Sequence, residues 1–518
     1  MALIKKLRQI YDNIYGFIDF QRKDFDFILK DPFFLRLHNL KQMGLAYYIY
    51  PDALHTRYAH SLGVYANVCK IINSQSRFED TIKVSDDDEY KIQLSALLHD
   101  IGHVPLSHTI ESALDKFDRY EKGTNQQMQV ETPQTKILLF SEPDEKIVAE
   151  KSNMAVEQKK TPKVALHECL GEAVLDNSSL GEELGKRGIA PLEIAAGFKG
   201  DMVDAYQQEH EEASQSLYST QIRNFLHSQL DADRIDYLLR DASFSGVNTG
   251  GIDIDKLLNS IVYNERQYGI EANAIRALDQ LFISRYIAYC QIVGNKKVMA
   301  FEYMASDFYY RLLKLRSEGN YHLGRRLYSY KDLIQDILPN DSNEFLTFTD
   351  DYFFSLVREV MSNKRMVARY DDLVVRYAEM LTMGKPLAAV TYIEGFEDKL
   401  VKPCFIEDLY METQKESSEE LDRIAYEAGV HRDDIIIPEP MKITIYKDDE
   451  DPVQVFNGKT LIHENVSQSP ASLLWMLANK RYCIYRIYVT DEAKKDDVRK
   501  ALLAFAESRG YKDLGDLK

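Results

Sequence analysis

The sequence predicts a mostly α-helical protein with a smaller α+β region at its C-terminal end. Through most of the first 400 residues, apolar side chains recur at the three- and four-residue spacing of amphipathic helices. Later the period changes, because MKITIYKDDEDPVQVF, TLIHENV and RYCIYRIYV have the composition of strands and DEAKKDDVRKALLAFAESRG is an amphipathic helix. A chain of 518 residues is too long for one ordinary core. We therefore expect a core over 1–320, a helical extension over 321–400 and an α+β unit over 401–518.

The N-terminal elements can be placed in order. Residues 1–20 are rich in β-branched and aromatic residues, which predicts a short extended segment. Residues 24–45 predict a helix that tolerates Pro32 in its first turn. A second helix is expected from near Thr56 to about Asn73, with Arg57 and His60 on one face. The charged stretch 76–90 then reads as a connection.

The segment LSALLHDIGHVPLSH, residues 94–108, is the stretch around which the chain is organised. Its leucines and Ile101 have the spacing of one buried helix face. Adjacent helical residues project about 100° apart, so His99 and Asp100 can reach one point beyond the helix edge. Gly102 and Pro105 end the helix and leave His103 and His108 on an irregular segment above that point. Imidazole beside carboxylate suits a divalent metal, although such a dipeptide alone is more often a helix cap or a surface ion pair.

The middle of the chain returns to a helical pattern after a polar stretch. Residues 115–165 predict a long insertion, which is either a solvated surface excursion or a regulatory flap. His167 lies at the start of the next helix, and residues 222–239 form a helix face that carries Asp233. Asp236 and Arg240 have the spacing of an ordinary helix ion pair. The glycine-rich SGVNTGG is a loop, Asp253 caps a helix, and a long helix is expected over 274–315.

Composition excludes several classes of protein. The net charge of −18 argues against a broad nucleic-acid surface, so nucleic acid is not an expected partner. No apolar run approaches the ~20 residues of a membrane span, and the N-terminus MALIKKLRQIYD has no secretion signal. The 5 cysteines are scattered, as in proteins with reduced thiols, and we expect a cytoplasmic protein.

The histidines gather in the first third of the chain. Those that can meet across packed helices, together with two aspartates, are His60, His99, His103, His108, His167, Asp100 and Asp233. Three or four His and carboxylate ligands suit a catalytic first-row metal that keeps positions open for substrate. The remaining histidines suit proton transfer near neutral pH. The expected cofactor is a divalent metal, namely Mn, Mg, Fe or Zn.

These residues resemble the HD superfamily of metal-dependent phosphohydrolases. The match extends beyond the metal ligands: QMG (42–44), YPDALHTRYAHSLGV (50–64), LLHDIGHVPLSH (97–108), HE (167–168) and LDADRIDYLLRD (230–241) are similar, in order, to the deoxynucleoside triphosphate triphosphohydrolase branch. That branch includes the sterile-alpha-motif/HD enzymes. The resemblance covers about residues 10–300 and implies a helical HD-domain core.

The resemblance implies roles for individual residues. His60, His99, Asp100 and Asp233 would hold the metal. His103, His108 and His167 would line the phosphates, one of them as general acid, with Glu111 where the family usually has Asp. Arg57 would act in catalysis at the α-phosphate. Substrate contacts would come from Gln42 at the sugar 3′-hydroxyl, from Tyr237 beside the sugar and phosphates, and from the phosphate ligands Arg234, Arg285 and Lys296.

Two departures from the family pattern affect the expected specificity. Relatives carry a tyrosine that packs against the deoxyribose, and here Val293 stands at that position. Guanine-specific activator contacts in the sterile-alpha-motif/HD enzymes fall on Lys30, Leu35 and His38 here, so that form of GTP activation is not expected. A different nucleotide activator stays open.

The main functional hypothesis is metal-dependent hydrolysis of deoxynucleoside triphosphates to deoxynucleoside and tripolyphosphate. One alternative is an HD-type phosphohydrolase or phosphodiesterase acting on another nucleotide or phosphate ester. The other is a nucleotide-binding regulator with a vestigial site. The resemblance also implies a homodimer or homotetramer, and no P-loop, HExxH or GxSxG motif supports a different chemistry.

Overall fold

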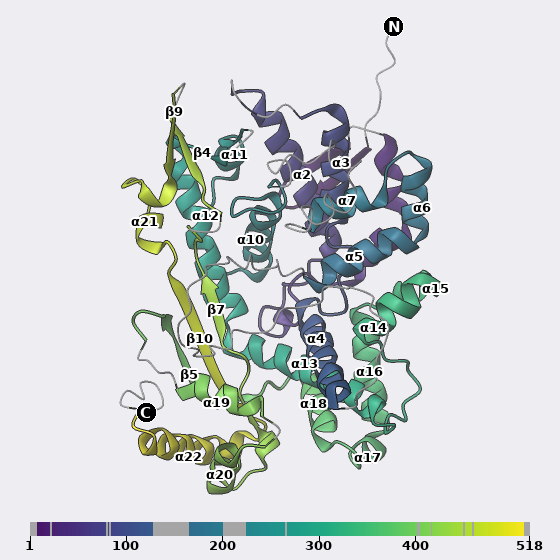
Figure 1. The fold of residues 1–518 in the computed structure, drawn as a ribbon, viewed down its shortest axis with the longest axis vertical. Coiled ribbons are helices and arrows are strands. Elements are labelled where there is room, and N and C mark those ends of the chain that lie inside the picture. Colours follow the sequence, from purple (N-terminus) through teal and green to yellow (C-terminus); the bar gives the residue numbers. More distant parts are fainter. Residues whose placement is uncertain are drawn as a thin grey trace, which may run out of the picture.

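The computed structural model describes residues 8–20, 23–78, 81, 84–127, 165–199, 224–264, 267–400, 405–415, 417–448, 451–457 and 460–511 (Figure 1). The expected mostly α architecture is confirmed. Helices before residue 200 are α1 (Pro32–Leu35), α2 (Arg57–Gln75), α3 (Asp86–Leu98), α4 (His108–Gln127), α5 (Leu166–Asn177), α6 (Ser179–Lys186) and α7 (Pro191–Phe198). Later helices are α10 (Ala232–Ser245), α11 (Ile254–Leu258), α12 (Ile275–Ala288), α13 (Lys296–Ser317), α14 (Tyr330–Asp332), α15 (Leu338–Phe345), α16 (Asp350–Ser362), α17 (Lys364–Val367), α18 (Asp372–Met383), α19 (Phe405–Thr413), α20 (Glu419–Ala428), α21 (Leu474–Leu477) and α22 (Lys495–Ser508).

The described strands form three sheets. Their bounds are β1 (Arg8–Asp12), β2 (Gly16–Phe20), β3 (Ile261–Tyr263), β4 (Tyr268–Glu271), β5 (Ala388–Phe396), β6 (Ile435–Ile436), β7 (Met441–Thr444), β8 (Gln454–Asn457), β9 (Thr460–Asn465) and β10 (Arg481–Val489). β1 and β2 form a hairpin, whose turn is closed by the Asp12 carboxylate and by Gly16 at φ 72°. The extended segment expected at the N-terminus is thus an antiparallel pair.

The prediction of one helix over residues 24–45 is wrong. The chain there forms short 3-10 turns around α1, because Asp31 takes an extended conformation before Pro32 and caps α1 through the Phe33 N–H. Proline disfavours helical geometry in the residue before it, so a helix cannot run through this point. The next helix, α2, begins where expected, since Thr56 accepts a hydrogen bond from the Ala59 N–H.

The two long helices that carry the site residues are packed side by side. α2 is buried over most of its length and contacts both α3 and α10. α3 begins after the cap Ser85 and has four acidic residues in its first turn, which favour the positive end of the helix dipole. Its last residue, Leu98, directly precedes His99, so the helix brings the His-Asp pair to its C-terminal end.

The observed helix α4 differs from two of the predictions made from the sequence. His108 is the first residue of this helix rather than part of an irregular segment. The helix runs to Gln127, so the first part of the expected insertion 115–165 is helical, with Phe117 and Leu114 in the core. The remainder of that insertion, residues 128–164, lies outside the described residues.

The helix expected over 222–239 begins only at Ala232, where Asp231 accepts a hydrogen bond from the Arg234 N–H. The long helix expected over 274–315 is interrupted by a π-helical turn, Tyr289–Val293, and by Gly294. The reason is tertiary: Arg486 of β10 donates to the Gly294 carbonyl, and a Cβ on Gly294 would lie 2.3 Å from Ile484. The C-terminal sheet therefore packs directly on this break.

The C-terminal strands pair with more than one part of the chain. β10 pairs with β5, β6 and β7, and the face of this sheet away from α13 is covered by α19, α20 and α22 (Figure 1). β8 pairs in parallel with β4 and antiparallel with β9, so residues before 320 and after 400 share one sheet. The division into three units at those residues stays a prediction.

One large hydrophobic cluster extends from Ile18 to Tyr488, and a second lies beneath α19, α20 and α22. In the part of the chain that the structure describes, none of the helices combines the length and apolar character needed to cross a membrane.

Candidate metal centre and adjoining cavity

Three residues predicted as metal ligands come together from three helical segments. His60 lies on α2, His99 follows α3, and Asp233 lies in the first turn of α10. Nε2 of His60 is 3.3 Å from Nε2 of His99 and 2.9 Å from Oδ1 of Asp233. Their donor atoms lie close enough together to hold one metal ion. Asp100, the fourth predicted ligand, adjoins them, with Oδ1 3.3 Å from Nε2 of His99.

The orientation of the two imidazoles fits a metal ion. Nδ1 of His99 lies 2.9 Å from the Ala96 carbonyl oxygen, and Nδ1 of His60 lies 2.7 Å from Oδ2 of Asp236. Each Nδ1 atom thus has an acceptor to which it can donate, which leaves the two Nε2 atoms, directed toward each other, as the atoms available to a metal. The two Nε2 atoms and the carboxylates of Asp100 and Asp233 converge on one point, where a divalent ion can bind all four.

The charges around the cluster also favour a bound cation. Burial alone lowers the pKa of His60, but hydrogen bonds and charges from Asp233 and Asp236 raise that pKa to about 10. Without a metal ion the ring therefore holds a second proton on the Nε2 that faces Asp233, and a divalent ion would replace this proton. Burial raises the pKa of Asp100, yet Arg57 and then His99 and His103 hold that pKa well below its ordinary value. The protein therefore keeps the carboxylates ionised and stabilises positive charge at this point, as a cation site requires.

Asp236 is a functional residue that sequence reasoning missed. It forms the expected ion pair with Arg240, whose other arm contacts Asp12 at 2.8 Å, but its carboxylate also orients His60. Metal-bound histidines commonly donate their second nitrogen to such a carboxylate. A signal was present, since Asp236 lies three residues after Asp233 and shares its helix face.

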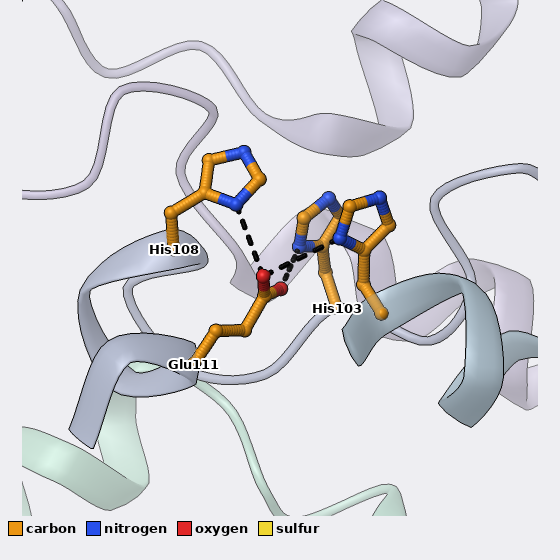
Figure 2. Close-up of side chains that lie close together, drawn as sticks. His103, His108 and Glu111 are labelled. Atoms are coloured by element: carbon orange, nitrogen blue, oxygen red, sulfur yellow. Dashed lines mark hydrogen bonds and ion pairs between the residues drawn. The ribbon is translucent and has the colours of Figure 1, made fainter. Parts of the chain in front are cut away.

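A second cluster lies directly beside the first. Figure 2 shows His103 and His108 pointing toward the carboxylate of Glu111 on α4. Nδ1 of His103 is 2.7 Å from Glu111, that of His108 is 3.0 Å away, and that of His167 is 3.3 Å away. Nε2 of His103 is 3.2 Å from Oδ1 of Asp100, so one imidazole links the two clusters. These four residues also have the geometry of a possible metal group.

The acid–base properties of the three histidines differ. Burial, then Arg57 and His167, lower the pKa of His103 to about 3, so this ring is neutral. Burial lowers the pKa of His167, but Glu111 more than compensates and the net shift is upward. His108 has a side chain that is 71% exposed. His167 can therefore carry a proton, whereas His103 positions the two carboxylates between which it lies.

α5 brings His167 to this cluster because two glycines allow close approach. A Cβ on Gly102 would lie 2.1 Å from the His167 carbonyl and 2.2 Å from the Gly171 nitrogen. Only a residue without a side chain fits there, and α5 can then lie against the loop that follows His99. The sequence marked Gly102 as a helix breaker, and the structure adds this packing role.

The loop before α4 has strained backbone and is held by residues from elsewhere. Leu106 and Ser107 have φ of 52° and 54°, the left-handed region that non-glycine residues seldom adopt. Arg57 donates to Oγ of Ser107 at 2.6 Å and to Oδ2 of Asp100 at 2.7 Å. The Asp350 carboxylate accepts the Leu106 N–H at 2.8 Å. Sequence reasoning did not identify Asp350, because it lies far from every motif.

A cavity of about 1000 Å³ opens beside the two clusters. Its walls include the predicted site residues Arg57, His108, Gln42 and Tyr237. Oε1 of Gln42 is buried without a hydrogen-bond partner in the described part of the chain, so it can accept a donor from a ligand. The structure thus places His108, the metal-site neighbour Arg57 and potential substrate contacts around one space.

The other predicted phosphate ligands are not in the cavity wall. Arg234 and Arg285 are partly buried and lie close enough together that burial and then the Arg234 charge lower the pKa of Arg285. The Nε atom of each has no hydrogen-bond partner among the described residues. Lys296 is exposed at the start of α13.

A tyrosine does face the cavity in the region where the sequence comparison found Val293. Tyr289 lies one turn earlier, in the π-helical segment, and both side chains line the cavity. The sequence could not show this, because the π-helical turn that sets the orientation of both residues depends on packing against β10.

Comparisons with known proteins agree with this geometry. Residues 57–238 match the family model described as HD domain. An uncharacterised protein of Mycoplasma genitalium is 28% identical over 331 residues, covering 62% of this chain and 64% of that protein. The deoxynucleoside triphosphate triphosphohydrolase SAMHD1 of Bos taurus is 34% identical over 122 residues, covering 23% and 20%. The chain spans less than two thirds of the length of either relative.

The fold is also similar to a solved structure. A phosphohydrolase from Bacteroides thetaiotaomicron has a TM-score of 0.63 and 19% identity, with 93% of this chain and all of that chain covered. The helices pack around convergent histidines and carboxylates. This arrangement is that of a helical metal-binding protein. Within that class, residues 57–238 match the HD domain, which binds divalent metals in a superfamily of phosphohydrolases.

Proposed function

We propose that the chain hydrolyses deoxynucleoside triphosphates to deoxynucleoside and tripolyphosphate. The observation that carries the proposal is the convergence of His60, His99 and Asp233 on one point that can hold a metal, beside a cavity that Arg57 and His108 line. The name of the bovine relative supports the substrate class, and the order of sequence motifs supports it independently.

The metal, Mn, Mg, Fe or Zn, would be held by His60, His99, Asp100 and Asp233. When bound, it would withdraw charge from a phosphoryl oxygen and supply the Lewis acidity of the reaction. The protein residues perform the other steps. Arg57, fixed by Asp100 and Ser107, presents its guanidinium to the α-phosphate, where a planar fork suits phosphate oxygens.

The reaction breaks the bond between the α-phosphorus and the 5′ oxygen. Water supplies a hydroxyl group to phosphorus and a proton to the leaving oxygen. We assign the proton donor to the His108–His167–Glu111 cluster, because His167 has a raised pKa and His108 faces the cavity. Arg234 and Arg285 add positive charge near Tyr237 and Tyr289 of the cavity wall, which favours a triphosphate of about four negative charges. Gln42 would contact the sugar 3′-hydroxyl, Tyr237 would lie beside the sugar and phosphates, and Lys296 would need to move inward.

The test is a product analysis with purified protein. Each deoxynucleoside triphosphate is supplied singly and in mixtures, with Mn²⁺ or Mg²⁺ and with ribonucleotide controls. We expect deoxynucleoside and tripolyphosphate. Orthophosphate or pyrophosphate instead would contradict the proposal and favour a hydrolase of another phosphate ester, and loss of metal from pure protein would favour a regulator with a vestigial site.

Variants at the metal ligands test the same proposal. Asp233→Ala and His99→Ala should each remove bound metal and hydrolysis while the circular dichroism spectrum stays unchanged. His322→Ala, at an exposed histidine outside the site, is the control and should keep both. Full activity in either ligand variant would contradict the metal assignment.

Several expectations from the sequence belong to this proposal. These are the homodimer or homotetramer, the nucleotide activator and the cytoplasmic location. Light scattering after size-exclusion chromatography, with and without added nucleotide, tests the first. Hydrolysis of one nucleotide in the presence of another tests the second.

A further inference from the structure

Glu302 on α13 is a carboxyl group in the cavity wall that the proposed chemistry does not use. It lies beside the QMG turn: Oε1 is 3.8 Å from the position that a Cβ on Gly44 would occupy. Thr109, the residue after His108, has its hydroxyl 3.9 Å from the same position. Glu302 is therefore close to the loop before α4 and to Gln42, the predicted sugar contact.

The other carboxylates of the cavity wall have partners. Asp241 lies 2.9 Å from His55, Asp307 lies 2.7 Å from Lys116, Asp433 lies 3.8 Å from His431, and Glu439 hydrogen-bonds to the Tyr410 hydroxyl. For Glu302 no hydrogen bond or ion pair is found among the described residues, and burial alone raises its pKa to about 7. Glu302 is partly buried in the cavity wall, and a carboxyl group that has lost water without gaining a protein partner is unfavourable. Donors from a ligand would satisfy it.

The surroundings of Glu302 suit a flat apolar group with a polar edge. Neighbouring positions in the cavity wall are Met43, Ala46, Val298 and Met299, which offer no hydrogen bonds from their side chains. Ligand sites commonly combine apolar walls with a few polar groups that fix orientation. A nucleobase has this form, and a cavity of about 1000 Å³ has room for a purine beyond the sugar and phosphates.

We propose that Glu302 reads the base of the substrate and that the preferred base is guanine. Guanine presents adjacent N1–H and N2–H donors, and a carboxylate accepts two parallel hydrogen bonds. Adenine and cytosine place an unprotonated ring nitrogen beside their amino group, which repels a carboxylate, and thymine offers one N–H between two carbonyls. This inference rests on the proposed function and names its substrate class.

The first test measures binding separately from hydrolysis. The metal-loaded protein is titrated with deoxynucleoside triphosphate analogues in which CH₂ replaces the 5′ oxygen, so that the scissile bond is absent. The guanine analogue should bind about 10- to 100-fold more tightly than the other three, the effect of one or two charged hydrogen bonds. The hypoxanthine analogue, which lacks the N2 amino group, should fall between guanine and adenine.

The second test changes the donor and acceptor pattern of the pocket. In Glu302→Gln the amide can accept from adenine N6–H and donate to N1, so the preference should move from guanine toward adenine. Glu439→Gln, in the same cavity wall, is the matched control and should keep the guanine preference. The same ranking is then measured as kcat/KM for the four natural triphosphates.

The outcomes separate this inference from the proposed function. Equal binding of all four bases by the unmodified protein, or an unchanged guanine preference in Glu302→Gln, would overturn the role of Glu302 alone. Absence of binding by every analogue would overturn the triphosphate substrate and this inference with it. The base series on the unmodified protein needs no variant, so the inference stays testable if a substitution prevents folding.

Discussion

At the scale of single residues, the proposed base contact Glu302 also affects how the stability of the folded protein depends on pH. Its pKa is about 7 in the folded protein, against an ordinary value of 4.5, because burial disfavours the charged form. Between these values the folded protein holds a proton that the unfolded chain has lost. The free energy of unfolding therefore falls as pH rises from 4.5 to about 7 and then levels.

Removing this charge should stabilise the ligand-free protein above neutral pH. We expect Glu302→Gln to raise the free energy of unfolding by about 1–3 kcal/mol at pH 8 and to change it little at pH 4.5, where both forms are neutral. Urea unfolding of both proteins at the two pH values measures this. Glu439→Gln serves as control, and equal stability of Glu302→Gln and the unmodified protein at pH 8 would show that the carboxyl is already compensated.

At the scale of elements, the contact between α2 and α10 determines the position of His60. A Cβ on Gly63 would lie 1.9 Å from Oδ1 of Asp236 and 2.6 Å from Nη2 of Arg240. The helices can approach this closely only because Gly63 has no side chain. Their closeness lets Asp236 on one helix orient His60 on the other.

Gly63→Ala should weaken metal binding although alanine favours helices. Intrinsic propensity alone would stabilise α2 by about 1 kcal/mol, but the methyl group displaces Asp236 and releases His60. We expect metal affinity to fall about 10- to 100-fold, the usual effect of losing such a partner, as measured by competition with a chelator. Gly185→Ala in α6, where nothing lies within 4 Å, is the control and should keep full affinity. Unchanged affinity in Gly63→Ala would mean that the helices separate without moving His60.

At the scale of the whole molecule, segments far apart in the chain fix the position of the loop before α4 through hydrogen bonds. Asp350, at the start of α16, accepts from the Leu106 N–H at 2.8 Å and from the Lys41 N–H at 3.0 Å. Arg36 donates to the carbonyls of His103 at 2.7 Å and Phe348 at 2.6 Å. The loop before His108 and the turn that contains Gln42 are thus joined through residues beyond the HD domain.

Asp350→Asn should therefore lower turnover without removing the metal. An asparagine can accept only one of the two N–H groups and turns a donor toward the other, which costs about 1–3 kcal/mol. We expect kcat to fall about 10- to 100-fold with metal content unchanged by elemental analysis. Asp351→Asn, at the exposed neighbouring position, should behave like the unmodified protein. Loss of metal together with activity would instead indicate a general collapse of the site.

The local features of the site could be predicted from the sequence. Periodicity located α2 and α5, which depend on neighbours within a few residues, where helical geometry is regular. The structure also brings together His60, His99 and Asp233, three of the four metal ligands that the family resemblance implied, although these residues are far apart in the chain. The predicted roles of Gln42, Arg234, Arg285 and Lys296 in substrate binding stay predictions.

Other features were decided by the tertiary structure alone. The break between α12 and α13 depends on β10, the strained loop depends on Asp350, and the unpaired state of Glu302 depends on which side chains reach it. Partners separated by hundreds of residues leave no periodic trace in a single sequence. The sequence by itself determined the helical class, because this follows from local spacing, and the resemblance of its motifs indicated the candidate metal ligands. Packing decided which side chains have hydrogen-bond partners, which backbone segments are strained and which polar groups are available to a ligand. Burial and close approach exist only in the folded chain.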